Sequence, residues 1–134
     1  MRFAMPEYFL ALVSQYSGAL NKSQAERYAK SVVDAWYYSS DNKTKTELLS
    51  LLPEYLRPQK KLFHNVLSPK VNLDQDDIFI SRVMAELSKT DSNEAEQIIA
   101  GVFKSLKIIS SQKSKFKYHS ALNGRMIKKV FIEA

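Results

Sequence analysis

The sequence predicts an all-α protein: a compact helical bundle of two pseudo-symmetric repeats, each with three to four helices. Three observations predict this fold. The chain of 134 residues contains only three glycines and four prolines, and it is rich in residues that favour helices. Its apolar residues recur at the spacing of one helix face. This pattern also occurs twice along the chain, at a constant offset.

The first expected helix begins at Pro6, which suits a first helical position, and ends at Gly18. The second expected helix covers 23–38, where Ser23 and Glu26 have the spacing of a capping box. The apolar faces of these two helices are predicted to be Phe9, Leu12, Val13 and Tyr16 in the first, and Ala25, Tyr28, Ala29, Val32, Val33 and Trp36 in the second.

A third helix is expected from a second capping-box pair, Thr44 and Glu47, which precedes a leucine-rich run. Pro53 should end this helix or start the next, because a proline ring clashes with the preceding turn. In the second half, a helix is expected over Ile78–Leu87, with the carboxylates of Asp74, Asp76 and Asp77 at its positive end.

An offset of 70 residues superimposes the second half on the first and gives ten identities, among them Val32 with Val102. The apolar face of 23–38 recurs at 93–108, where Asn93 and Glu96 repeat the cap. We therefore expect one domain over 1–134, made of a first repeat (about 5–67) and a second (about 74–132), joined by a linker at 67–73. Each repeat is too short for a large core of its own, so the two should pack face to face.

Each repeat opens with a similar run, Glu7-Tyr8-Phe9-Leu10 in the first and Asp77-Ile78-Phe79-Ile80 in the second. The first repeat continues through Ala25-Glu26 to a helix that ends in Leu52-Pro53 and closes with Leu56-Arg57. This order resembles bacterial proteins of the domain-of-unknown-function family numbered 2267, which also carry it twice. The second repeat departs from the pattern at Leu122-Asn123. The resemblance implies an all-α tandem fold and transfers no catalytic residue.

The residues show no catalytic or cofactor-binding pattern. The chain lacks cysteine, and its two histidines, His64 and His119, have no metal-ligand spacing around them. The glycines are scattered, so no phosphate-binding loop is expected. Gly101 falls inside an expected helix, where it should mark a close helix crossing. We therefore expect a protein that is not an enzyme and needs no metal or cofactor.

The basic residues are concentrated. The formal charge is 20 − 14 = +6, and residues 100–134 carry eight bases against Glu133 alone, a net of +7, whereas 71–99 carry two bases against seven acids, a net of −5. Clustered lysines can neutralise phosphates or simply solubilise a face. The candidate phosphate contacts are Arg57, Lys60, Lys61, Lys104, Lys107, Lys113, Lys115, Lys117, Arg125, Lys128 and Lys129.

Consecutive aromatic residues offer a second candidate surface. Trp36 continues the apolar face, so Tyr37 and Tyr38 cannot both lie on it, and an off-face tyrosine is typical of protein-binding patches. We expect a non-catalytic helical binding module, an adaptor or regulatory subunit that engages a protein partner. The alternative is a basic nucleic-acid-binding protein, and a homo-oligomer stays open. No apolar run approaches the ~18 residues of a membrane-spanning helix, so no membrane partner is expected. Because Pro6 and Glu7 interrupt the first apolar stretch, no signal peptide is expected and the protein should be cytoplasmic.

Overall fold

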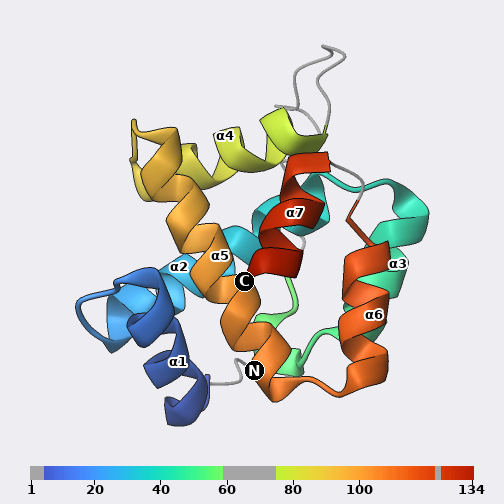
Figure 1. Ribbon diagram of the computed structural model, residues 1–134, viewed down its shortest axis with the longest axis horizontal. Helices are drawn as coiled ribbons and strands as arrows, with labels where there is room; N and C mark the ends of the chain where they lie inside the picture. Colours follow the sequence, from blue (N-terminus) through green and yellow to red (C-terminus); the bar gives the residue numbers. More distant parts are fainter. Residues whose placement is uncertain (1–4, 59–74, 123–124) are drawn as a thin grey trace.

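The computed structural model describes residues 5–58, 75–122 and 125–134, with side chains except at 75–77 and 125. These parts of the chain are helical and contain no strand, which confirms the all-α prediction (Figure 1). None of the described helices combines the length and apolar character needed to cross a membrane. The elements are α1 (Glu7–Ser17), α2 (Lys22–Tyr38), α3 (Asn42–Leu51), the 3-10 turn η1 (Glu54–Leu56), α4 (Gln75–Leu87), α5 (Ser92–Ile109), α6 (Gln112–Ser120) and α7 (Arg125–Glu133).

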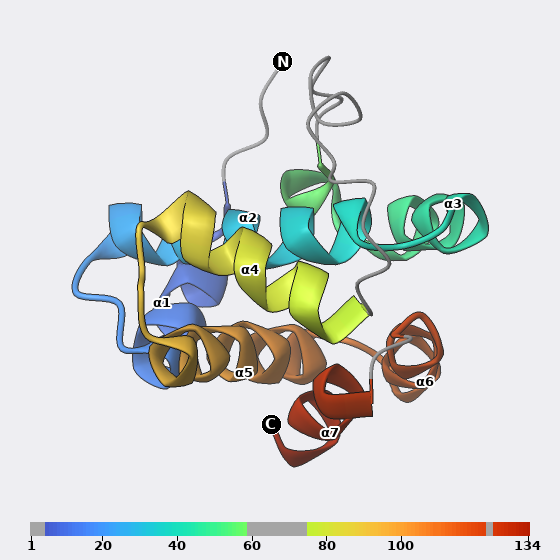
Figure 2. The same ribbon diagram turned by 90° about the horizontal axis from the view of Figure 1, so that it is seen from above.

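The two long helices, α2 and α5, form the centre of the bundle. α1 packs against α5 as well as against its neighbour α2, and α4 packs against α2 as well as against α5. The opening helix of each half therefore covers the long helix of the other half, as Figures 1 and 2 show. α3 and α6 lie beside each other at one end of the bundle, and α7 packs along α5.

The helix boundaries follow the 70-residue offset. α2 and α5 begin at 22 and 92, and α3 and α6 begin at 42 and 112. All twelve predicted face positions of α2 and α5 are buried, and Val32 and Val102 are almost completely inaccessible. The two faces thus share one interior. A twofold axis relating the two repeats in space stays a prediction.

Aromatic rings fill the middle of this interior. Trp36 contacts Phe103 and Tyr118, each with 5.6 Å between ring centroids, and Phe103 also contacts Phe79 and Phe131. The indole N–H of Trp36 donates to the carbonyl oxygen of Ala121 at 3.3 Å. This bond satisfies the only polar atom of the indole side chain and attaches α6 to α2.

The predicted capping residues are wrong by two or three positions. Asn21, not Ser23, caps α2 by accepting from the backbone N–H of Gln24 at 2.8 Å. Asp41, not Thr44, caps α3, and Asp91, not Asn93, caps α5. In each case a side-chain oxygen of Asn or Asp lies upstream of the predicted residue and reaches the first free backbone N–H groups, so the helix begins earlier.

The first helix differs from the prediction in detail. Pro6 precedes α1 as its N-cap and is not a helical residue. Leu10 is buried, whereas Leu12 and Tyr16 are half-buried, so α1 turns a slightly different face to the core. Gly18 ends the helix with a φ of +81°, as predicted.

Two more predictions concern helix ends. α3 ends at Leu51, and Pro53 starts the turn η1, as expected. α4 begins at Gln75, three residues earlier than predicted. The linker at 67–73, Asp74 and the side chains of Asp76 and Asp77 lie outside the described residues.

Candidate binding groove between α6 and α7

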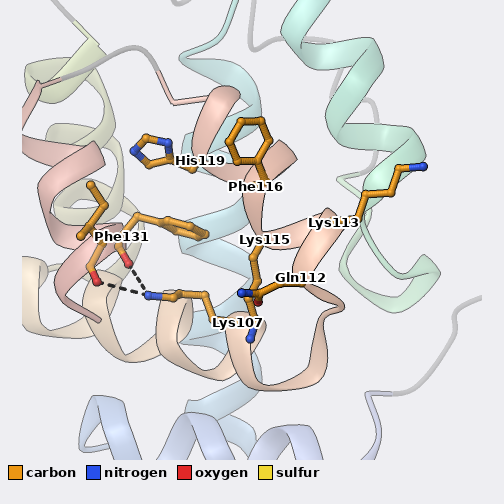
Figure 3. A pocket seen from close by; sticks show the side chains of 8 residues that line it. Lys107, Gln112, Lys113, Lys115, Phe116, His119 and Phe131 are labelled. Atoms are coloured by element: carbon orange, nitrogen blue, oxygen red, sulfur yellow. Dashed lines mark hydrogen bonds between the residues drawn. The ribbon is translucent and has the colours of Figure 1, made fainter.

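An open groove of about 570 Å³ lies where the end of α5 meets α6 and α7 (Figure 3). Its walls combine positive charge with aromatic and aliphatic surface, and no acidic side chain lines it among the residues that the structure describes. The lining residues are Lys107, Gln112, Lys113, Lys115, Phe116, His119, Phe131 and Ile132.

The opposite face of α6 determines which residues reach the groove. Tyr118 and Ala121 are buried against α2 and α3, where the Tyr118 hydroxyl donates to the carbonyl oxygen of Leu51 at 2.8 Å. Burial raises the pKa of this phenol to about 12. With this face turned inward, positions 112, 115, 116 and 119, which share the other side of the helix, line the groove.

Lys107, which lines the groove, links α5 to the end of α7. Its ammonium donates to three carbonyl oxygens at the C-terminal end of α7, those of Phe131 (2.8 Å), Ile132 (3.3 Å) and Ala134 (3.0 Å). A cation there satisfies free carbonyl groups and the negative end of the helix dipole. Burial lowers the pKa of Lys107, and the nearby charges of Lys115 and Lys104 lower it further. Lys107 therefore joins α5 to α7, and its three N–H donors are already used.

Two large apolar side chains stand exposed at the groove. Phe116 on α6 is 74% exposed and Ile132 on α7 is 62% exposed. Phe131 is buried and points its ring toward the groove (Figure 3). Single exposed apolar residues are common on protein surfaces, but several around one concave site are typical of a binding surface.

His119 packs its ring against Phe131, with 6.2 Å between centroids. Its Nε2 atom is buried and has no hydrogen-bond partner among the described residues, an arrangement that costs free energy. No carboxylate lines the groove to orient this imidazole. In the described parts of the chain, no three His, Cys, Asp or Glu side chains are grouped to hold a metal ion. His64 lies outside those parts.

Tyr37 and Tyr38 are half-buried and pack edge to face on each other, with 5.0 Å between ring centroids. The ammonium of Lys45 lies over both rings, at 5.5 and 5.8 Å, and the guanidinium of Arg82 lies over Tyr38 at 5.7 Å. The cations of this chain thus already cover much of the aromatic surface predicted to bind a partner.

The other predicted cations are spread over several elements. Arg57 is exposed and donates to the carbonyl oxygen of Leu52, and Lys104 lies over the ring of Tyr16 at 4.4 Å. Lys117 is exposed on α6; on α7, Lys129 is exposed and Lys128 half-buried. Lys60, Lys61 and the side chain of Arg125 lie outside the description. Of the eleven candidates, the structure brings Lys107, Lys113 and Lys115 together at the groove.

Sequence reasoning missed Phe116 and Ile132, although one signal was available. Phe116 is out of phase with Tyr118 and Leu122, which belong to the core, and the 70-residue offset pairs it with the polar Thr46. A phenylalanine on the polar side of a lysine-rich helix is the kind of residue that core packing does not explain.

In comparisons with known proteins, the chain matches no family model, no curated protein and no solved structure. The fold defines its class as an all-α helical bundle.

Proposed function

We propose that this chain is a non-catalytic binding module, an adaptor or regulatory subunit, that engages a protein partner through the groove between α6 and α7. One observation carries the proposal: Phe116 and Ile132, both largely exposed, flank a concave site. Exposed aromatic and aliphatic side chains around a pocket are what protein partners bury as anchors. The groove lining contains no pair of acid and base that would support catalysis.

The groove is a better candidate than the tyrosine pair. The rings of Tyr37 and Tyr38 contact each other and Lys45, so a partner would have to displace contacts within the chain. Phe116 makes no such ring contact among the described residues, and a partner would bury its surface directly.

Site-specific photocrosslinking tests this proposal. A photoreactive amino acid replaces Phe116 in the full chain, and a second variant carries it at Leu20, which is 87% exposed in the loop between α1 and α2. We expect a discrete protein adduct from position 116 in living cells and none from position 20. A third variant at Tyr38 tests the tyrosine pair. Equal labelling at 116 and 20, or adducts from Tyr38 alone, would refute the groove as the contact.

The lysines of α6 favour nucleic acid as a second candidate partner. Lys113, Lys115 and Lys117 alternate along the helix that exposes Phe116. Lysines neutralise phosphates, and a base stacked on an aromatic ring is worth about 1–3 kcal/mol. Under this function, affinity for an oligonucleotide should fall steeply as salt rises. A flat titration with both DNA and RNA at low salt would remove it.

We also propose, from the resemblance in helix order, that the chain is a distant relative of the domain-of-unknown-function family 2267. The recurring boundaries of α2 and α5 support a tandem ancestry.

A further inference from the structure

We infer that the groove receives an acidic amphipathic segment of the partner, whose carboxylates meet Lys113 and Lys115 and whose apolar side chains pack between Phe116 and Ile132. This inference rests on the proposed function and specifies the chemistry of the partner.

The charge of the groove favours an acidic ligand. Residues 100–134 carry a net charge of +7, and the groove lining contains three lysines and no acid. Ion pairs within the described residues join Lys22 to Glu7, Lys30 to Glu26 and Lys89 to Glu94, and none of these three includes a groove lysine. Complementary carboxylates would relieve this unbalanced charge and would guide association.

The lysines differ in what they can offer. Lys107 already donates to three carbonyl groups of α7. Lys113 is exposed and extends away from Phe131, and Lys115 is half-buried beside Gln112 (Figure 3). Lys113 and Lys115 are therefore the groove cations able to pair with a ligand. Because residues two positions apart on a helix do not share a face, the two lysines would meet carboxylates on different sides of α6.

The apolar part of the groove favours an amphipathic peptide over other anionic ligands. A free phosphate would use the lysines and leave Phe116 and Ile132 in water. A single-stranded nucleic acid could stack a base on Phe116, but Ile132 has no ring for stacking. An amphipathic peptide uses both side chains, because apolar residues at helical spacing enter a groove while its charged residues meet the rim.

The chain itself provides a matched control. The 70-residue offset pairs Lys113 with Lys43 on α3, and it pairs Phe116 with Thr46. Lys43 is exposed like Lys113, but it belongs to a helix without the exposed phenylalanine. Any attraction due only to net charge should respond equally to changes at Lys43 and Lys113.

The experiment measures fluorescence anisotropy of labelled probes against the full chain. The main probe is a designed amphipathic peptide with leucines on one helical face and glutamates elsewhere. The other probes replace its glutamates by lysines, replace its leucines by serines, or substitute a single-stranded oligo(dT). We expect the Glu/Leu peptide to bind at least about tenfold more tightly than each of the other three.

The variants locate the site. Lys113→Glu should weaken Glu/Leu binding clearly more than its matched control Lys43→Glu, which should have little effect. Lys113→Glu combined with Lys115→Glu should weaken it at least about tenfold. Phe116→Ala should weaken it at least about tenfold, and Leu20→Ala should not. Fluorescence of the single, buried Trp36 verifies that each variant is folded. Four of the five substituted side chains, those of Lys43, Lys113, Phe116 and Leu20, are exposed, and that of Lys115 is half-buried. None belongs to the core, so these changes should leave it intact.

Several results would overturn the inference. These are equal binding of the lysine peptide or of the serine peptide, tighter binding of oligo(dT), no binding of the Glu/Leu peptide, or equal effects of Lys43→Glu and Lys113→Glu. The proposed function fails on a different observation, the absence of a protein adduct at position 116. Protein adducts at 116 together with failure of the acidic peptide would keep the binding module and remove its acidic partner.

Discussion

Gly101 on α5 lies directly against the backbone of Ser17 on α1. A Cβ atom built on Gly101 would be 2.6 Å from both the Cα and the N atom of Ser17, much closer than two such atoms approach in proteins. The crossing of α1 and α5, which joins the two halves of the chain, therefore depends on the missing side chain. The sequence predicted this close crossing at Gly101, and the structure confirms it.

We expect Gly101→Ala to lower the free energy of unfolding by about 1–3 kcal/mol, because the obstructing atoms are backbone and cannot rotate away. In an ordinary helix interior, the same change would stabilise by about 1 kcal/mol. Chemical denaturation followed by Trp36 fluorescence measures the difference. A more stable Gly101→Ala variant would contradict the close approach of α1 and α5.

The N-cap of α2 can be tested by paired substitutions. Asn21→Ala should lower the free energy of unfolding by about 1 kcal/mol, since it leaves the N–H of Gln24 without its acceptor. Ser23→Ala should change stability by less than about 0.5 kcal/mol, because Ser23 is an exposed residue inside the first turn. The reverse order of effects would restore Ser23 as the capping residue.

Lys107→Met should destabilise the protein by about 1–2 kcal/mol, because three carbonyl groups of α7 lose a charged donor. The loss should concentrate in α7, where amide hydrogen exchange will accelerate. Lys129→Met is the control, since Lys129 is exposed on α7, and its effect should stay within about 0.5 kcal/mol. Equal effects of the two variants would show that net charge, not the contact with α7, determines stability.

Stability should fall at alkaline pH because of Tyr118. Burial raises the pKa of this phenol to about 12, whereas the unfolded chain ionises it near 10. Above pH 10 the unfolded state therefore has lost the proton that the folded state retains, and the free energy of unfolding decreases as pH rises from 10 to about 12. The contribution of Tyr118 to this slope cannot exceed about 1.4 kcal/mol per pH unit, because a single proton is involved, and solvent near the hydroxyl reduces it further.

The measurement compares the wild type with Tyr118→Phe over pH 7 to 11. The variant loses the hydrogen bond to Leu51 at every pH, so the difference between the two proteins should be constant below about pH 9. It should then shrink above pH 10, where Tyr118 lowers the stability of the wild type and is absent from the variant. A difference that stays constant to pH 11 would show that Tyr118 ionises normally in the folded state.

Local rules correctly predicted the elements and failed on several of their ends. The apolar face of α2 follows from spacing alone, because residues three and four positions apart share one side of a helix. The prediction of its N-cap was wrong because Asn21 and Ser23 are both good capping residues, and the capping-box spacing favoured Ser23. Which of them supplies the acceptor depends on where the chain enters the helix, and the bundle decides this.

The candidate binding residues also differ in whether local sequence rules could predict them. Tyr37 and Tyr38 were predicted as a binding surface because they directly follow Trp36. In the folded chain, however, Lys45 lies over both rings and Arg82 lies over the ring of Tyr38. Phe116 was not predicted as a surface residue, because the sequence did not show which side of α6 packs into the core. Whether a side chain is exposed depends on whether other helices pack over it, and those helices are distant in the sequence.

The sequence by itself determined that this chain is helical, where its long helices lie, and that a 70-residue pattern repeats, because these properties depend on neighbours within one or two turns. Only the tertiary structure decided that Lys107 is used to hold α7, that Tyr118 and Ala121 face inward, and that Phe116 and Ile132 line the same basic groove. Such relationships join residues from different helices, and the packing of α5, α6 and α7 against one another creates them.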